Sequence, residues 1–374
     1  MDLGLNETQQ MLRTSAREFL EAECPTSYVR DMERDERGYT PQFWDKLAGL
    51  GWLGLVFPER YGGSELGFVE LAILLEEMGR VLLPGPYFST VLMAGMTIAE
   101  AGSDDQKREY LSGIASGRLI MTLALTEPSG RWDAEGVQAM AEPSGGGFAL
   151  NGVKLYVPNA NVSDHVIVAA RTGQEESDVS LFVVPSNTDG LTITALQTIA
   201  SDKQSEIALD NVYVPGSALL GELSGGWNVI EKALAWGAVG KCAEMLGGAQ
   251  QTLDMTVAYA KQRIQFGRSI GSFQAIQHHV ADMAADVEGC RYITYQAAWA
   301  LAEGLPAERE VAMAKAWVSD AYHRVCMTAH QCHGAIGFTK EHDLQLYSRR
   351  AKVGELMFGD SEHHMEAVAS AVGL

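Results

Sequence analysis

Residues 357–364 read MFGDSEHH and are dense in groups that can exchange a proton. Asp360 is a candidate general base, because a carboxylate within hydrogen-bond reach of an activated C–H can take its proton. The segment also has the pattern of a helix start. An Asp at the N-cap accepts backbone N–H bonds, and a Glu in the first turn, here Glu362, favours the helix dipole. The residues favour the cap for Asp360, since capping needs no unusual geometry, and leave the base open.

A second stretch, KQRIQFGRSIGSFQAIQHHVADM at 261–283, joins polar and aromatic groups around a glycine-rich break. An arginine fork suits phosphate, a Gln amide can bond a heterocycle edge, and a Phe ring can stack on adenine or flavin. The alternative is a helix–helix turn with an arginine ion pair, and both interpretations stay open here. The residues concerned are Arg263, Gln265, Phe266, Phe273 and Gln274.

Composition limits the classes of function. The 374 residues are 47% hydrophobic and carry a net charge of −20, which disfavours nucleic acids and anionic membranes as partners. Apolar runs are interrupted by charge within a few residues, so no membrane insertion is expected. The N-terminal residues lack a basic region followed by an apolar one, which predicts a cytoplasmic protein without an export signal. The five cysteines are scattered and odd in number, which is typical of reduced thiols.

Three regions must position these groups. Residues 1–115 show apolar spacing of three and four, typical of helices; residues 116–225 alternate with a period of two; residues 226–374 return to long helices with short connections. We predict an α+β protein with an N-terminal α-helical domain, a middle β-barrel-like domain and a C-terminal four-helix bundle. No G-x-G-x-x-G, phosphate-binding loop or H-E-x-x-H motif is present, and the paired histidines 278–279 and 363–364 favour surface or interface roles over metal.

Several ordered strings resemble the acyl-CoA dehydrogenase family. They are FPERYGG (57–63), LALTEPSG (123–130), NGVKLYVPNA (151–160), the 261–283 stretch and QCHGAIGF (331–338). The resemblance covers nearly the whole chain. It implies an FAD enzyme that removes an α-proton and a β-hydride from an acyl-CoA and passes electrons to an electron-transfer flavoprotein.

The resemblance also implies roles for single residues. Leu125 and Thr126 are expected at the flavin ring, and Tyr156 takes the place of a Trp against it. Cofactor contacts shared between subunits imply a tetramer or dimer. The cofactor-binding residues expected on this basis are Leu125, Thr126, Trp132, Tyr156, Arg263, Gln265, Phe266, Phe273, Gln274, Gln331, Ala335, Asp360 and Glu362.

The chain departs from the family around the substrate and the flavin. Trp132 stands where a small Ser is common, and Arg131 is a candidate substitute for a phosphate contact. Pro158 replaces a Thr and brings neither hydroxyl nor N–H. Residues 235–238 read AWGA, where family members often have an Asp and an Arg that contact the substrate and CoA. We therefore expect this chain to bind CoA through other contacts. The resemblance places Gly237 beside the acyl group.

The family's catalytic Glu is missing. Aligned on the usual loop, Phe358 takes the Glu position, with Gly359 next to it at the substrate, and Gly237 takes the position that a second subgroup uses. Three sources of the base stay open: Asp360, displaced by two residues; Glu244, seven residues after Gly237 and about 10 Å along the helix; or a Glu-bearing homologue in a heterotetramer. The backbone N–H of Phe358 remains available to hold the thioester oxygen.

The sequence therefore predicts α,β-desaturation of an acyl-CoA with FAD and without metal. A base-less partner subunit of a heterotetrameric acyl-CoA dehydrogenase is the first alternative, and a flavin monooxygenase on the same fold is the second.

Overall fold

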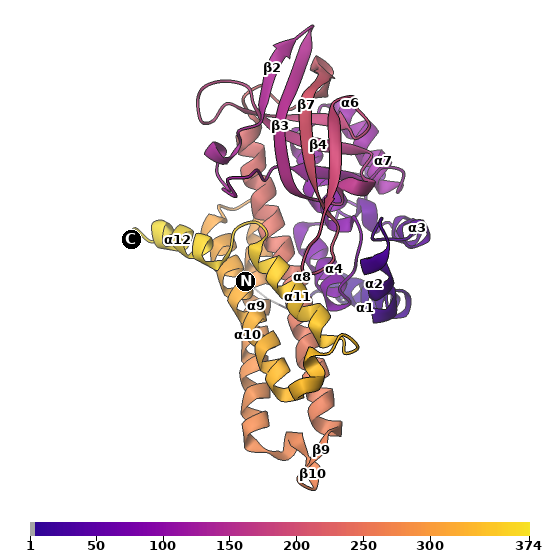
Figure 1. Ribbon diagram of the computed structural model, residues 1–374, viewed down its shortest axis with the longest axis vertical. Coiled ribbons are helices and arrows are strands. Elements are labelled where there is room, and N and C mark those ends of the chain that lie inside the picture. Colours follow the sequence, from indigo (N-terminus) through magenta and orange to yellow (C-terminus); the bar gives the residue numbers. More distant parts are fainter. Residues whose placement is uncertain (1–3) are drawn as a thin grey trace. The chain divides into compact units, whose positions relative to one another are not determined.

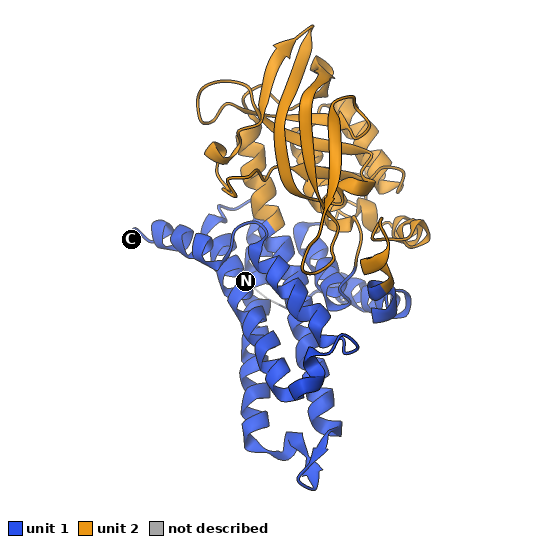
Figure 2. Ribbon diagram, viewed as in Figure 1, with its two compact units in different colours: residues 1–30, 67–83, 238–374 blue, residues 31–66, 84–237 orange. Residues whose placement is uncertain are grey.

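The computed structural model describes residues 4–374, which form two compact units (Figure 2). Unit 1 combines the described residues up to Arg30 with Gly67–Leu83 and Ala238–Leu374. Unit 2 combines Asp31–Leu66 with Pro84–Gly237. Each unit is assembled from segments far apart in the sequence, and the predicted ranges 1–115, 116–225 and 226–374 stay a prediction.

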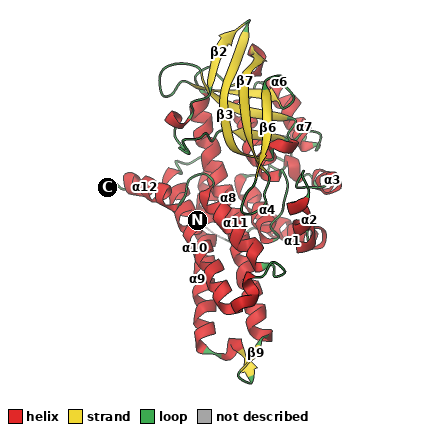
Figure 3. Ribbon diagram, in the orientation of Figure 1, coloured by secondary structure: helices red, strands yellow, loops and turns green. Residues whose placement is uncertain are grey.

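Unit 2 contains an eight-stranded mixed sheet (Figures 1 and 3). Its order is β6-β7-β3-β2-β4-β5-β8, and β1 pairs with β4 in parallel. β4 and β5 are buried along most of their length, which explains their nearly continuous apolar sequences. The strands are β1 (Met121–Ala124), β2 (Met140–Ser144), β3 (Gly147–Pro158), β4 (His165–Arg171), β5 (Val179–Pro185), β6 (Leu191–Leu196), β7 (Gln204–Pro215) and β8 (Leu219–Leu220).

The short helices of unit 2 follow from their sequences. Thr40 caps α3 by accepting a bond from the N–H of Phe43, and Pro41 is the first helical residue, as the Thr-Pro pair predicts. The α-helices that lie wholly in this unit are α3 (Pro41–Gly49), α5 (Met96–Ala101), α6 (Asp104–Gln106) and α7 (Ser112–Ala115).

Unit 1 is a helical bundle in which α10 packs along α9, α11 and α12, and α4 packs on α1 and α9. A short hairpin of β9 (Ile264–Gln265) and β10 (Arg268–Ser269) joins α8 to α9. None of the helices in the described part of the chain is long and apolar enough to cross a membrane. The helices are α1 (Glu7–Glu23), α4 (Phe68–Arg80), α8 (Gly226–Gln262), of which the part from Ala238 belongs to this unit, α9 (Gln274–Ala302), α10 (Glu308–His333), α11 (Leu344–Leu356) and α12 (Ser361–Ala371).

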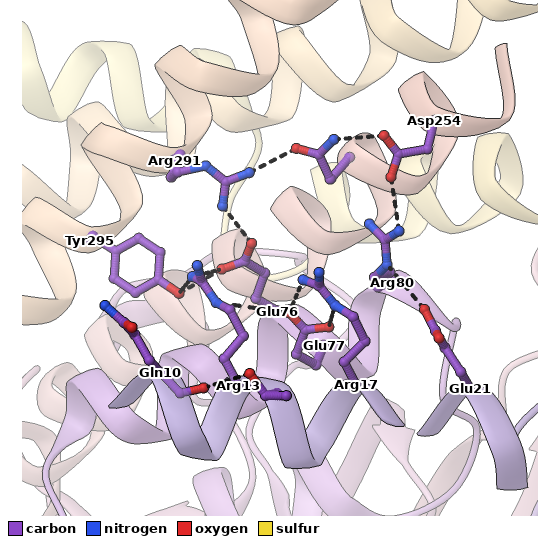
Figure 4. Close-up of polar contacts among 12 residues, drawn as sticks. Gln10, Arg13, Arg17, Glu21, Glu76, Glu77, Arg80, Asp254, Arg291 and Tyr295 are labelled. Carbon is purple, nitrogen blue, oxygen red and sulfur yellow. Dashed lines mark hydrogen bonds and ion pairs between the residues drawn. The ribbon is translucent and has the colours of Figure 1, made fainter. Parts of the chain in front are cut away.

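A buried ionic network ties α1, α4 and α9 together (Figure 4). The Glu76 carboxylate is 4% exposed; it accepts bonds from Arg13 at 3.0 Å and from Arg291 at 2.6 Å. The Tyr295 hydroxyl donates to the same carboxylate at 2.5 Å and accepts from Arg13 at 2.9 Å. Burial of a carboxylate is costly without such partners, so the network fixes where these helices meet.

Helices α4 and α8 touch backbone to backbone. A Cβ added to Gly247 would lie 1.8 Å from the carbonyl oxygen of Glu76, and one added to Gly79 would lie 2.0 Å from that of Glu244. No side chain larger than hydrogen fits at either position. This contact fixes the part of α8 that carries Glu244.

Candidate active site

The loop between α11 and α12 is the first part of the candidate site. Asp360 is the N-cap of α12, and its Oδ1 accepts the N–H of His363 at 3.0 Å. The predicted cap is therefore confirmed, and the carboxylate already has a hydrogen-bond donor. Glu362 lies in the first turn of the helix with an exposed side chain.

Two consecutive residues of this loop have a left-handed backbone. Phe358 has φ +60° and Gly359 has φ +86°. A Cβ on Gly359 would lie 2.5 Å from Cδ2 of His363, so only glycine fits there. Phe358 is buried, and a bulky residue rarely adopts this conformation unless its surroundings impose it.

Two buried side chains hold this conformation. Lys315 on α10 is fully buried, and its Nζ donates to the carbonyls of Gly359 at 2.8 Å and Glu355 at 2.9 Å, and to Ser319 Oγ at 3.1 Å. His364 Nε2 lies 2.8 Å from the carbonyl oxygen of Phe358. That oxygen can only accept, so Nε2 carries the hydrogen.

Burial perturbs both side chains. Desolvation lowers the pKa of Lys315 to about 8 and that of His364 to about 4. His364 is therefore neutral at physiological pH. The surface or interface role predicted for the 363–364 pair is wrong for His364, because its ring is turned back onto the loop and buried.

Glu244 and Gly237, the other positions considered for a base, lie on α8. The Glu244 carboxylate is 24% exposed and pairs with Lys241 one turn earlier on the same helix. It therefore has a cationic partner within its own chain. Gly237 is buried and belongs to unit 2.

The segment expected at the flavin ring lies in unit 2 after β1. Leu125 and Thr126 are half-buried, and the carbonyl of Thr126 accepts the N–H of Leu155 at 2.8 Å. The next residue, Glu127, is buried and pairs at 2.6 Å with Lys154, whose side chain is 0% exposed. Burial lowers the pKa of Lys154, while the adjacent Glu127 opposes that shift.

The Glu127 carboxylate also accepts the N–H groups of Gln138 at 2.9 Å and Ala139 at 3.0 Å. The ion pair therefore ties the loop after β1 to the start of β2 and to the middle of β3. Leu125 and Thr126 immediately precede this anchored residue, so their backbone is held in place from one side.

A β-bulge presents Tyr156. Between the pairs Lys154–Ile207 and Val157–Ser205, β3 has two residues where β7 has one. Tyr156, inside the bulge, has φ +55° and is 57% exposed. A large aromatic ring held outward in this way is suited to stack on a planar ligand.

The loop after Glu127 carries Arg131, the candidate for a phosphate contact, which stays a prediction. Arg131 pairs with Asp133 at 2.6 Å and with Glu135 at 2.5 Å, and all three side chains are about half exposed. Its guanidinium therefore already has two carboxylate partners. Trp132 is half-buried, and Pro158, also half-buried, is the last residue of β3.

The connection from α8 to α9 exposes the predicted aromatic and polar groups. Phe266 is 93% exposed with φ +55°, and its ring meets that of Phe273 edge-on at 6.1 Å. Arg268 lies over the Phe273 ring, 4.1 Å from its centroid. Among the described residues, neither Arg263 nor Arg268 forms an ion pair, so the turn exists without the salt bridge of the alternative interpretation. The remaining residues predicted to bind the cofactor here, Arg263, Gln265 and Gln274, are exposed.

The QCHGAIGF segment (331–338) contains both exposed and buried residues. Gln331 and Ala335 are exposed, whereas His330, Cys332 and His333 are buried. All five cysteines of the chain are free and buried. The histidine rings stack on Phe338 and Tyr259 with centroids 4.4 Å apart, so they serve packing.

Three family models together match most of the chain. They are the acyl-CoA dehydrogenase N-terminal domain at residues 6–118, the middle domain at 122–212 and the C-terminal domain at 224–373. The chain belongs to the acyl-CoA dehydrogenase family. Such membership makes it an oxidoreductase that acts on acyl-CoA, and the predicted α+β fold is confirmed.

Individual relatives agree with this assignment. The chain is 35% identical to a probable acyl-CoA dehydrogenase, YngJ of Bacillus subtilis, over 97% of each chain. It is similar to a chain of the ChsE4–ChsE5 complex from Mycobacterium tuberculosis, with a TM-score of 0.92 and 30% identity, covering 100% of this chain and 99% of that one. It is also similar to an FAD complex of PigA, with a TM-score of 0.93 and 27% identity over 100% of both chains.

Sequence reasoning missed the buried groups that support the site: Lys315, His364 and the Glu127–Lys154 pair. A signal existed for two of them. A lone lysine interrupts the apolar face of VAMAKAWV at 311–318, and another interrupts the alternating strand NGVKLYV at 151–157. A cation at a core position implies a buried acceptor.

Proposed function

We propose that this chain catalyses the α,β-oxidoreduction of an acyl-CoA thioester with FAD. The observation that carries the proposal is the family match along nearly the whole chain, together with the exposed side chains of Tyr156, Phe266 and Gln331 in three of the expected flavin segments. FAD, when bound, takes the hydride from the β-carbon and passes the electrons to an electron-transfer flavoprotein. FAD is the cofactor that the family and the FAD-bound PigA complex support.

The residues present fit FAD. Tyr156 offers an exposed ring on a bulge beside the anchored backbone of Leu125 and Thr126. Phe266 is almost fully exposed, and an aromatic side chain in that state is suited to contact a planar ligand or a neighbouring subunit. Arg263 has no ionic partner among those residues and can meet a phosphate.

Residues of the chain itself are proposed to bind and orient the thioester. The loop at Phe358 offers its backbone N–H to the thioester oxygen, and such a donor stabilises the negative charge that develops when the α-proton leaves. Gly359 keeps the loop free of a side chain at the substrate. Gly237 leaves space for the acyl group.

The base that accepts the α-proton has two candidates within the chain. Asp360 would have to give up its cap bond or share its carboxylate between the helix and the substrate. Glu244 would have to leave Lys241. Asp360→Asn and Glu244→Gln test both, since each keeps the size of the side chain and an acceptor oxygen.

The test is an anaerobic titration of the FAD-loaded protein with a panel of linear, branched and cyclic acyl-CoA esters, followed by flavin absorbance. Bleaching that persists in both variants excludes both carboxylates as the base. Bleaching abolished in one of them, with FAD affinity unchanged, identifies it.

A second candidate function is that of a base-less subunit in a heterotetramer with a Glu-bearing homologue. It is favoured by Phe358 at the usual base position and by the cap bond of Asp360, and the ChsE4–ChsE5 complex provides a heteromeric relative. Co-purification with such a homologue, without bleaching by the chain alone, supports this function. Rapid reoxidation of reduced flavin by air would instead favour the monooxygenase.

The proposed assembly is a tetramer or dimer in which Gln331 and Ala335 reach the cofactor of an adjacent subunit. Both residues are exposed, as that role requires. Sedimentation velocity of the FAD-loaded protein measures the assembly, and a monomer would contradict this part of the proposal.

A further inference from the structure

The two carbonyls of the left-handed turn are each bonded to a buried donor. The carbonyl of Phe358 accepts from His364, and the carbonyl of Gly359 accepts from Lys315. Peptide units are planar and trans, so the carbonyl and the N–H of one unit point in opposite directions. The N–H of Gly359 must therefore point away from His364, and that of Asp360 away from Lys315.

The outward N–H of Gly359 has no hydrogen-bond acceptor within the described residues. Buried backbone groups are nearly always paired, and Gly359 is itself buried. This donor adjoins Phe358, whose N–H is expected at the thioester oxygen. The loop thus places an unused donor next to the proposed reacting group.

We propose that Lys315 and His364 are positioning residues for the thioester: they hold the carbonyls of Phe358 and Gly359, which fixes the turn with the unpaired N–H of Gly359 facing the thioester oxygen. This inference rests on the proposed function and adds residues to its site.

The hydrogen-bond arrangement around Lys315 tolerates both protonation states. An ammonium donates to the two carbonyls and to Ser319 Oγ. A neutral amine keeps two N–H groups for the carbonyls, and its lone pair can accept the Ser319 hydroxyl. Positioning therefore survives deprotonation of Lys315. The titratable groups that influence Lys315 are Lys241 and Cys242 on α8, Glu355 on α11, Asp360 and His364.

The experiment compares two ligands in calorimetry with the FAD-loaded protein. One is the 3-thia analogue of whichever acyl-CoA bleaches the flavin best; its β position is sulfur, so it has no β-hydride to lose. The other is free coenzyme A, which has the same carrier but no thioester carbonyl. The ratio of their dissociation constants measures the contacts of the acyl thioester as a whole, and the change in that ratio between the wild type and a variant measures what the variant removes from them.

Lys315→Met removes the three donors and keeps an unbranched side chain. We expect it to weaken the 3-thia analogue about fivefold to tenfold, in line with one lost hydrogen bond, and coenzyme A less than twofold. His364→Leu should act in the same direction, and His364→Gln, whose amide N–H can reach the same carbonyl, should restore most of the loss. The His364 pair keeps the test usable if Lys315→Met does not fold.

The outcomes separate the two proposals. If the wild type binds neither ligand and no acyl-CoA bleaches its flavin, the proposed function fails. If the wild type binds both and the ratio is unchanged in Lys315→Met and His364→Leu, the positioning role is overturned. A wild-type ratio that stays constant between pH 7 and 9 supports positioning by hydrogen bonds, whereas a thioester affinity that falls through pH 8 assigns Lys315 a charge effect and overturns it.

Discussion

Removal of Lys154 is expected to destabilise unit 2 strongly. Its side chain is 0% exposed, that of Glu127 is 4% exposed, and their charged atoms lie 2.6 Å apart. Breaking a buried ion pair from one side costs about 3–5 kcal/mol, because the remaining charge stays desolvated. The N–H groups of Gln138 and Ala139 still solvate the carboxylate in Lys154→Met, which places the expected loss at about 3 kcal/mol.

The matched control is the double variant Glu127→Gln with Lys154→Met. It replaces both charges by neutral groups of similar size, and such replacements of whole buried pairs are often close to neutral. We expect it to recover more than half of the loss. Urea unfolding of the cofactor-free protein, followed by circular dichroism, measures the wild type, the two single variants Glu127→Gln and Lys154→Met, and the double variant as a cycle.

The cycle also has a functional readout. Because the pair anchors the backbone after Thr126, Lys154→Met should weaken FAD binding, and the double variant should regain part of the affinity. A loss below about 1 kcal/mol in Lys154→Met, or a double variant less stable than the single one, would refute the view that the buried pair holds this loop.

Three further predictions concern unit 1. Asp360→Ala should cost about 1 kcal/mol of unfolding free energy, and Asp360→Asn less than half of that, because Asn also caps helices; equal losses in the two variants would contradict the cap. Arg291→Met leaves Glu76 with fewer donors and should cost about 2 kcal/mol, less than a fully buried pair since Arg291 is 22% exposed, and an unchanged urea midpoint would argue against the network of Figure 4. Burial lowers the pKa of Lys315 from 10.5 to about 8. Between these two pH values the unfolded chain still binds the proton that the folded state has released, so the folded state becomes more stable as pH rises. The unfolding free energy of the wild type, relative to Lys315→Met, should therefore grow by roughly 3 kcal/mol over that interval, and a difference that stays flat with pH would show that Lys315 is not desolvated.

The fold was largely predictable because its elements have strong local signals. Apolar residues that recur every three or four positions indicate α1 and α4, and the Thr40-Pro41 pair indicates the start of α3. Period-two alternation and turn residues mark the strands of unit 2. The assembly of two units from distant segments was not predictable, because contacts such as that between Gly247 and the carbonyl of Glu76 join positions with no local relation in sequence.

The site residues whose role depends on residue type alone could be predicted from the sequence. Those whose role depends on being buried could be predicted less well. The exposure of Tyr156 and Phe266 agrees with their expected roles, which stay predictions. His364 was misplaced because adjacent histidines on a helix give no sign of which one faces inward. Lys315 was missed because a lysine in a helix is usually solvated, and only the tertiary structure places Gly359 and Glu355 around its ammonium.

The central claim is that this chain uses FAD to oxidise or reduce an acyl-CoA. The most direct measurement is the visible absorbance of the purified, FAD-loaded wild-type protein during an anaerobic titration with the acyl-CoA panel, alone and together with a Glu-bearing homologue. We predict a yellow protein whose flavin absorbance falls with at least one acyl-CoA in one of these two conditions. A protein that takes up no FAD, or whose flavin no acyl-CoA bleaches under either condition, would contradict the claim.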